Sequence, residues 1–165
     1  MSDKPINRWL ILLSGILINL CIGAAYAWSV YQKPLINLFK WSTKEASLAF
    51  TISFLMVPLA MIVAGKIQDQ KGPKMVIFGG GIIYAAGIIG AGFTSNLTIL
   101  YLTYGMLGGI GIGTIYACTV ANTVKFFPDK RGLASGLVVA GFASGAVVLA
   151  PLSSALIEAY GVLST

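Results

Sequence analysis

The chain has 165 residues, of which 57% are hydrophobic and only 10% are charged, and its mean hydropathy is +0.87. An ordinary soluble domain is about 25% charged, and a chain of this size leaves much of its surface exposed, so the composition excludes a typical soluble protein. The net charge of +6 does not indicate a nucleic-acid partner, since the basic residues form no patch and lie in short connections between apolar stretches.

Charged residues are missing from four long windows, and these windows define the predicted elements. A helix needs about 20 residues to cross the apolar core of a bilayer, so three of the windows hold one span each. The window at residues 75–124 is long enough for two spans and contains a polar break at 94–96. We therefore predict an all-α membrane protein with five transmembrane helices, at about residues 9–32, 46–66, 74–94, 97–124 and 131–157.

The first predicted span admits a second interpretation. Ala25, Tyr26 and Ala27 follow a basic start and an apolar run, as residues at a signal-peptide cleavage site do. However, the uncharged stretch has the length of a membrane span, and the polar Asn19 interrupts it. These features favour a helix that stays in the protein.

Basic residues are divided unevenly between the two sets of connections. With the N-terminus in the cytoplasm, three lie outside, Lys33, Lys40 and Lys44, within an expected outer loop at 33–45. Eight then lie in cytoplasmic segments: Lys4, Arg8, Lys66, Lys71, Lys74, Lys125, Lys130 and Arg131. Lys and Arg are enriched on the cytoplasmic side, so the sequence predicts a multi-pass protein of the plasma membrane with a cytoplasmic N-terminus.

Most of the 20 glycines lie in the last three predicted spans. Small residues let helices approach closely in a membrane, where association relies on packing. We expect close helix contacts at these glycines, and a glycine-rich face would also permit rocking between helices. Helical spacing or adjacency groups them as Gly105, Gly109 and Gly113, as Gly132 and Gly136, as Gly141 and Gly145, and as Gly79, Gly80 and Gly81.

The connection between the second and third predicted spans, residues 65–74, is short and charged. Gly65 and Gly72 allow turns in the backbone, and Pro73 suits the first turn of the next helix. Asp69 can accept hydrogen bonds from helix amides or pair with a cation. On these grounds alone the segment is a generic positive connection.

The same segment resembles the signature loop of the major facilitator superfamily, at its expected place in the chain. Gly65, Asp69, Gly72 and Lys74 match the loop, whereas Gln70 and Pro73 replace its usual basic residues. The resemblance implies that Asp69 helps to hold one conformation by bonding across two halves of the fold. The loss of the basic residue at Gln70 removes part of that latch.

Two further segments resemble the oxalate/formate antiporter branch of the superfamily. They are residues 26–35, which end the first span, and residues 127–136, which open the fifth and continue into 139–145. The resemblance covers the whole chain, 1–165, and implies most of the N-terminal six-helix bundle of a twelve-span fold, with the C-terminal half absent. Asp129, in the second segment, is also a natural N-cap for the fifth helix.

Polar side chains inside the spans are candidates for a substrate cavity, because such groups face protein or water rather than lipid. Asn19 and Tyr26 are seven residues apart and share one helix face. Tyr116 shares a face with Thr119 and Thr123. For Tyr116, substrate contact and helix–helix bonding both remain open, whereas helix–helix bonding is favoured for Asn19.

The resemblance to the antiporter branch implies aromatic cavity walls, which adds Tyr31 and Phe142 to Tyr26. The predicted spans hold no basic residue away from their ends, and an unpaired buried carboxylate is costly. In the resembling branch, basic residues of the C-terminal half hold the substrate. The expected function is therefore secondary transport of small carboxylates such as oxalate, formate or lactate by alternating access. The expected partners are the lipid bilayer, a small organic anion and the missing C-terminal half.

Other functions stay open. A transporter of the same superfamily could carry sugars, drugs or nitrate, and a five-span structural or assembly subunit would have the same composition. A membrane-embedded enzyme is disfavoured, because the chain has no His and no charge within its spans. No cofactor, metal or nucleic acid is expected, since Cys21 and Cys118 lie inside predicted spans as small core residues.

Overall fold

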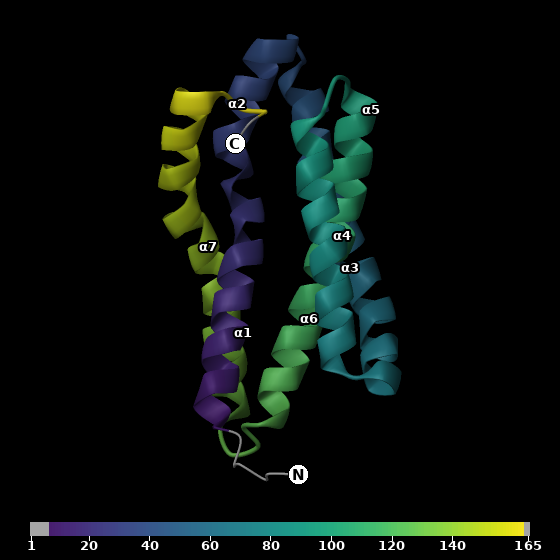
Figure 1. Ribbon diagram of the computed structural model, residues 1–165, viewed down its shortest axis with the longest axis vertical. Helices are drawn as coiled ribbons and strands as arrows, with labels where there is room; N and C mark the ends of the chain where they lie inside the picture. The colour runs from purple at the N-terminus through teal and green to yellow at the C-terminus, as the bar shows by residue number, and fades with distance from the viewer. Residues whose placement is uncertain (1–6, 164–165) are drawn as a thin grey trace.

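The computed structural model describes residues 7–163, and all regular secondary structure in this part is helical (Figure 1). Lys4, which contributed to the predicted topology, lies outside the described residues. Five helical stretches in the described chain are long and apolar enough to cross a membrane. They are Arg8–Phe39, Thr43–Lys71, Pro73–Gly92, Leu97–Lys125 and Arg131–Tyr160, here called spans 1 to 5. The prediction of an all-α membrane protein is confirmed.

Span 1 consists of α1 (Arg8–Ile22), the 3-10 segment η1 (Gly23–Ala27) and α2 (Trp28–Phe39). The expected outer loop at 33–45 is wrong, because α2 continues through Lys33 and Pro34 to Phe39. A long lysine side chain can reach the headgroup region from within a span, so a charge at this depth does not end the helix. The helix ends where Lys40 adopts a left-handed conformation, at a φ of 58°.

Span 2 is α3 (Thr43–Lys71), and span 3 is α4 (Pro73–Gly92). The start of α3 is fixed by a capping box, in which Ser42 Oγ accepts from the Glu45 amide at 3.2 Å. Glu45 Oε2 accepts in return from the Ser42 amide at 2.8 Å. Such reciprocal bonds satisfy amides that would otherwise have no partner in the first turn. Between α3 and α4, Gly72 makes the turn with a φ of 80°.

Span 4 follows the predicted polar break and consists of α5 (Leu97–Leu100), the π-helical segment η2 (Tyr101–Gly108) and α6 (Gly109–Lys125). Asn96 caps α5, because its side chain accepts from the Ile99 amide at 3.0 Å. Span 5 is α7 (Arg131–Tyr160). The expected N-cap role of Asp129 is wrong: Lys130 occupies the cap position without a side-chain bond, and Asp129 instead pairs with Arg8 at 2.9 Å.

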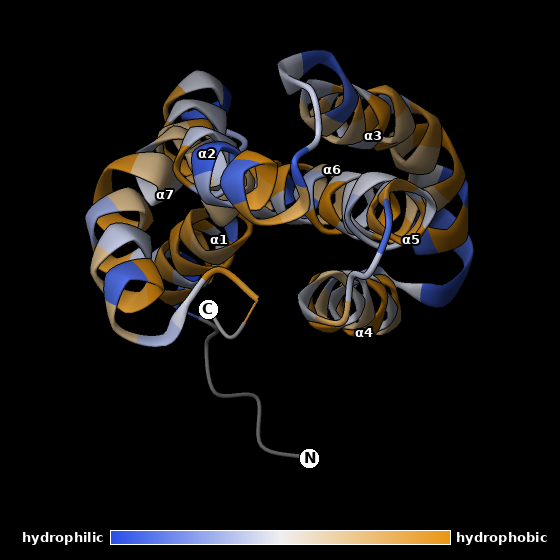
Figure 2. Ribbon diagram, turned by 90° about the horizontal axis from the view of Figure 1, so that it is seen from above, coloured by the Kyte–Doolittle hydropathy of each residue, from blue (hydrophilic) through white to orange (hydrophobic). Residues whose placement is uncertain are grey.

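Seen along the long axis, α6 lies between two groups of helices (Figure 2). The helices α1, α2 and α7 lie on one side, and α3, α4 and α5 lie on the other. α6 contacts α3, α4, α7 and α1, so it joins the two groups. Below, the end of the molecule that holds residue 7 is called the lower end, and the end with the α2–α3 turn is called the upper end, as in Figure 1.

Glycines make the close contacts of α6, as the sequence suggested. A Cβ added at Gly109 or at Gly113 would collide with carbonyl oxygens of α3. A Cβ at Gly111 would lie 2.7 Å from the Tyr84 Cα atom of α4. Gly109 and Gly113 therefore let the backbone of α6 pack against that of α3, and Gly111, which lies between them in the sequence, lets it pack against that of α4. Helix association in a membrane depends on such close approach.

Other glycines do not serve this purpose. On α7, Gly145 packs against α1 and η1, with the Gly23 Cα atom 2.7 Å from the position a Cβ would take. By contrast, Gly132 and Gly136 of the same helix, and Gly79 and Gly81 of α4, have only open space beside them within the described chain. The expected helix contact is absent at these four positions.

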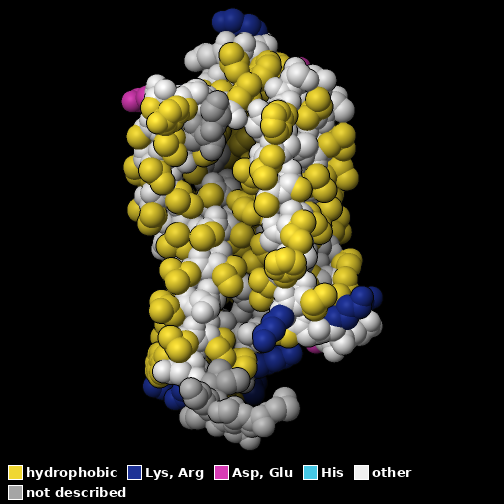
Figure 3. All heavy atoms as spheres, viewed as in Figure 1, with side chains coloured by type: hydrophobic (Ala, Val, Ile, Leu, Met, Phe, Trp, Pro, Cys, Tyr) yellow, Lys and Arg dark blue, Asp and Glu magenta, His cyan; other side chains and the backbone are white. Residues whose placement is uncertain are grey.

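The surface is apolar along the length of the molecule and charged at its ends (Figure 3). Phe78, Phe93 and Val147 are exposed by 70%, 80% and 76%. Apolar side chains of this size, exposed on each of the five spans, are suited to contact with lipid rather than water. Lys and Arg side chains gather mainly at the lower end.

Candidate functional site

A row of aromatic rings crosses four spans at the middle of the chain's helices. The Tyr26 ring of η1 and the Phe142 ring of α7 have centroids 4.9 Å apart, and the Tyr116 ring of α6 lies 5.3 Å from Phe142. On the other side of Tyr26, Phe54 of α3 lies 5.4 Å away, and Phe50 lies 4.5 Å from Phe54. These separations are typical of stabilising aromatic pairs. We call these five residues the aromatic row.

The tyrosines of the aromatic row keep their hydroxyl groups free. Tyr26 is 42% exposed, Tyr116 is partly buried, and within residues 7–163 neither hydroxyl has a hydrogen-bond partner. Phe142 between them is buried, and it packs against the core residues Ile22 and Ile112. The two hydroxyls are therefore available to a ligand, on rings that the core holds in place.

Asn19, a predicted cavity residue, lies between α1 and α6. Its side chain is fully buried, and its Nδ2 donates to the Gly15 carbonyl at 2.8 Å and to Thr119 Oγ1 at 2.7 Å. Thr123 Oγ1 donates in turn to the Thr119 carbonyl at 2.7 Å. This arrangement is a helix–helix bond, which is the interpretation that the sequence favoured.

Tyr31, also a predicted cavity residue, lies apart from the aromatic row. Its hydroxyl donates to Ser153 Oγ at 2.7 Å, which joins α2 to α7 near the upper end. The ring packs in a separate cluster around Trp28 and Leu35. The structure thus brings together Tyr26, Tyr116 and Phe142 but not Asn19 or Tyr31.

Phe50 and Phe54 were missed by sequence reasoning. They are four residues apart on one face of α3, which is a spacing that could have drawn attention. Phenylalanine is nevertheless common on lipid-facing surfaces of apolar helices. Only the packing of α3 against the other spans shows which face of α3 meets Tyr26.

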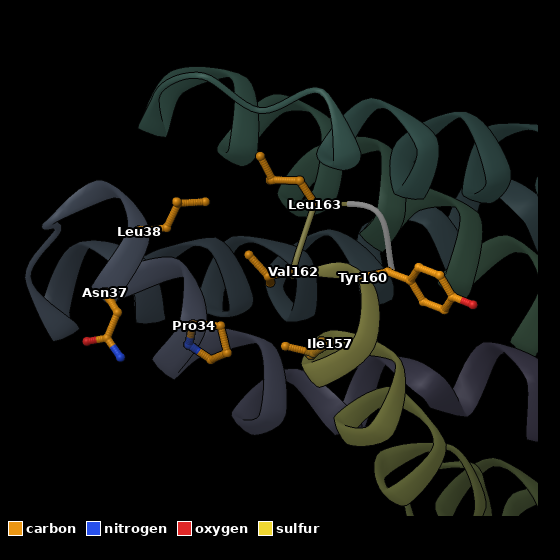
Figure 4. Close-up of a pocket in the computed structure, with 8 residues that line it drawn as sticks. Pro34, Asn37, Leu38, Ile157, Tyr160, Val162 and Leu163 are labelled. Carbon is orange, nitrogen blue, oxygen red and sulfur yellow. The ribbon is translucent and has the colours of Figure 1, made fainter.

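Two hollows on the surface lie away from the aromatic row. One, with a volume of about 530 Å³, lies at the upper end between α2 and the end of α7, where Pro34, Leu38, Ile157 and Tyr160 surround it (Figure 4). The other, of about 460 Å³, lies between α1 and α6. Neither of these two hollows is lined by a residue of the row, so the exposed side of Tyr26 lies outside both of them.

Among residues 7–163, no three His, Cys, Asp or Glu side chains lie together as metal ligands would. Apart from Lys33 within α2, the charged residues of the described spans lie toward the helix ends, as Arg8, Lys71 and Lys125 illustrate. The aromatic row is therefore an uncharged surface with two hydroxyl donors.

Comparison with known proteins adds to this geometry. Residues 9–165 match the family model of the Major Facilitator Superfamily. The chain belongs to this superfamily. With five apolar helices in the described part, it is a multi-pass membrane protein of a transporter family.

Curated members of the superfamily resemble the chain along nearly all of its length. An oxalate:formate antiporter of Oxalobacter formigenes is 32% identical over 157 residues, which are 94% of this chain and 37% of the antiporter. An uncharacterized MFS-type transporter of Escherichia coli K12, YhjX, is 29% identical over 164 residues, or 99% of this chain and 41% of that protein. Monocarboxylate transporter 9 of Gallus gallus is 34% identical over 146 residues, or 86% and 28%. The chain thus spans less than half the length of these relatives.

The segment that resembles the superfamily's signature loop lies at the lower end, but it is mostly helical. Gly65 and Asp69 are on the last turns of α3, Lys74 is on the first turn of α4, and Gly72 alone interrupts the helices. The expected backbone turn at Gly65 is wrong. Asp69 is exposed, and no hydrogen bond or ion pair reaches its carboxylate from the rest of the described chain.

Proposed function

We propose that this chain belongs to a secondary transporter that carries small carboxylates, such as oxalate, formate or lactate, by alternating access. The observation that supports this most strongly is the aromatic row, with the free hydroxyls of Tyr26 and Tyr116 on either side of Phe142. A relative of the same superfamily is named for exchange of oxalate and formate, and another for monocarboxylates.

The chemistry of the row suits a small, flat anion. Each phenolic hydroxyl can donate one hydrogen bond to a carboxylate oxygen, and bonds to charged acceptors are the stronger kind. The edges of aromatic rings carry partial positive charge, which favours a carboxylate that approaches them in the ring plane. The row also excludes water from one side of a ligand, which strengthens the remaining electrostatic contacts.

The row alone does not neutralise a carboxylate. Transfer of an unpaired charge to an apolar environment is very costly, so a cationic side chain must complete the site. We propose that a C-terminal half, facing the open side of the row, supplies that cation. The lower end would then be cytoplasmic in the plasma membrane, because most of the basic residues lie there. Asp69, exposed at that end, would bond across the two halves.

Transport by the full-length protein in liposomes tests this proposal. We expect vesicles loaded with unlabelled oxalate or formate to take up labelled oxalate or formate rapidly, with slow uptake into empty vesicles. Sugars, nitrate and cationic drugs serve as comparison substrates. Uptake of one of these without carboxylate uptake would overturn the carboxylate assignment, and no uptake of any solute would support a structural subunit.

The role of the row is tested by substitution in the same assay. Phe142→Leu and Tyr116→Phe are each expected to raise the KM for the carboxylate about five- to tenfold, as the loss of a ring contact or one hydrogen bond implies. Phe78→Leu, on the exposed face of α4, is a matched control and should leave KM unchanged. Equal KM values in all three variants and the parent protein would contradict the role of the row.

A further inference from the structure

Irregular helical segments interrupt two spans, 1 and 4, which contact each other through α1 and α6. The 3-10 segment η1 (Gly23–Ala27) interrupts span 1, and the π-helical segment η2 (Tyr101–Gly108) interrupts span 4. A 3-10 stretch inside a longer helix often marks a hinge or a site under strain. π-helical turns are rare in proteins, and those that occur are often found at functional sites. Tyr26 of the aromatic row lies within η1.

One residue connects the two segments. The Tyr104 hydroxyl of η2 donates to the Ala25 carbonyl of η1 at 3.3 Å. The Tyr104 ring also packs against the Trp28 ring, with centroids 4.5 Å apart and planes 32° from parallel. Ala25 directly precedes Tyr26, and Trp28 follows it by two residues. Tyr104 therefore contacts the chain on both sides of Tyr26, while its own ring contact is with Trp28 and not with the row.

The Tyr104 hydroxyl bonds to a carbonyl that takes part in the 3-10 geometry at the end of η1. The same oxygen accepts from the Trp28 amide, three residues further along the chain. In an α-helix it would accept instead from the amide of Ser29, four residues along. Carbonyls that tilt outward toward an additional donor bend a helix away from regular α geometry. The Tyr104 hydroxyl is such a donor, and in an apolar membrane few others compete for the carbonyl.

The difference between the two geometries is large at Tyr26. A 3-10 helix turns about 120° per residue and an α-helix about 100°, so a change over the five residues of η1 would rotate one flank against the other by about 100°. A rotation of that size would move the Tyr26 ring out of the gap between Phe54 and Phe142. The contacts of Tyr26 within the aromatic row therefore require the 3-10 geometry of η1.

We infer that Tyr104 is a positioning residue, which holds η1 in its 3-10 form so that the Tyr26 hydroxyl faces the substrate. This inference rests on the proposed function of the aromatic row. Tyr104 acts through the Ala25 carbonyl and the Trp28 ring and does not touch the substrate itself.

The neighbouring Tyr101 offers a matched control. Its hydroxyl, also in η2, donates to a backbone carbonyl, that of Glu45 on α3, at 2.9 Å. Tyr104→Phe and Tyr101→Phe each remove one hydroxyl-to-carbonyl bond, but only the first affects η1. In the full-length protein, Tyr104→Phe should raise the carboxylate KM about fivefold with little change in the maximal rate, and Tyr101→Phe should leave KM unchanged.

Hydrogen exchange tests the local step without any substrate. Peptides that cover residues 23–29 should exchange faster in Tyr104→Phe than in the parent protein or in Tyr101→Phe. Faster exchange confined to Tyr104→Phe supports the inference. Equal exchange in the two variants overturns it, whatever the transport assay gives.

A double-mutant cycle separates this inference from the proposed function. If Tyr104 acts through Tyr26, Tyr104→Phe should have no further effect on KM in a Tyr26→Phe background. Additive effects would overturn the positioning role and leave the aromatic row in place. If Tyr26→Phe alone left KM unchanged, the proposed role of the row would fail, and the exchange experiment would still decide whether Tyr104 holds η1.

Discussion

Arg8 Nη1 lies 2.9 Å from Asp129 Oδ1, and this ion pair joins two segments that are 121 residues apart in the chain. The Arg8 guanidinium also lies 5.2 Å from the centroid of the Phe127 ring, and Phe127 is buried. The pair therefore connects the first turn of α1 to the connection before α7 at the lower end. Both side chains are almost half exposed, so water weakens the ion pair while the ring contact persists.

We expect Asp129→Asn to lower the free energy of unfolding by no more than about 1 kcal/mol, because exposed ion pairs contribute little. Arg8→Gln should cost more, since it also removes the contact with Phe127. Unfolding of the purified protein in detergent, measured for both single variants and the double variant, gives the coupling energy. Lys130→Gln is the neighbouring control. A coupling energy of zero would show that the ion pair contributes nothing to the free energy of unfolding, although the two side chains are close together.

Two glycines of α7 should respond in opposite ways to the addition of one methyl group. Gly145→Ala places a Cβ against the backbone of η1 and should destabilise the fold by about 1–3 kcal/mol, as overpacking does. Gly136→Ala adds a Cβ in open space and should be neutral or slightly stabilising, because alanine favours the helix. The unfolding free energies of the two variants provide the measurement. Equal losses would contradict the close packing of α7 against span 1.

The buried bond between Asn19 and Thr119 should depend on a hydroxyl at residue 119. Thr119→Val removes the acceptor and leaves the Asn19 amide short of one partner, which should cost about 0.6–2 kcal/mol. Thr119→Ser keeps the hydroxyl and should retain most of the stability. If the valine variant were as stable as the serine variant, the hydrogen bond would contribute nothing to the contact of α1 with α6.

Tyr31 and Ser153 should behave as one unit. Tyr31→Phe and Ser153→Ala each break the 2.7 Å bond between α2 and α7. The double variant should therefore lose no more stability than the less stable of the two single variants. Carboxylate KM should be unchanged in Tyr31→Phe, because the hydroxyl is already engaged away from the aromatic row. A raised KM with unchanged stability would instead indicate that Tyr31 contacts the substrate, as the resemblance to the antiporter branch implied.

The sequence was sufficient to predict the spans but not all of their ends. Windows without charge follow directly from the cost of a charged group in lipid, and the five helices lie where these windows are. The loop expected at 33–45 was wrong because Lys33 lies within α2, where its flexible side chain can reach the headgroup region. Asp129 was expected to cap α7, but its bond to Arg8 depends on tertiary packing that no local pattern contains.

The aromatic row was predictable only in part. Tyr26 and Tyr116 stand out as polar groups in apolar helices, so a sequence argument could find them. Phe54 carries no such signal, and its contact with Tyr26 depends on how α3 is rotated. The contact of Tyr104 with Ala25 depends on two departures from α-helical geometry, which the sequence of apolar and small residues does not encode in any simple pattern.

The pairing of span 1 with span 5 and the connection before it imposes an order on biosynthesis. Asp129 and Ser153, the partners of Arg8 and Tyr31, are synthesised 121 and 122 residues after them. At about 5–20 residues per second, the first span waits roughly 6–24 s in the insertion machinery or the lipid before the fifth emerges. Helices α3, α4 and α6 can pack on one another in the meantime. Span 1 thus enters the bilayer before spans 2 to 4 but completes its contacts only after them, and until then its unpaired surface needs protection by the translocation apparatus.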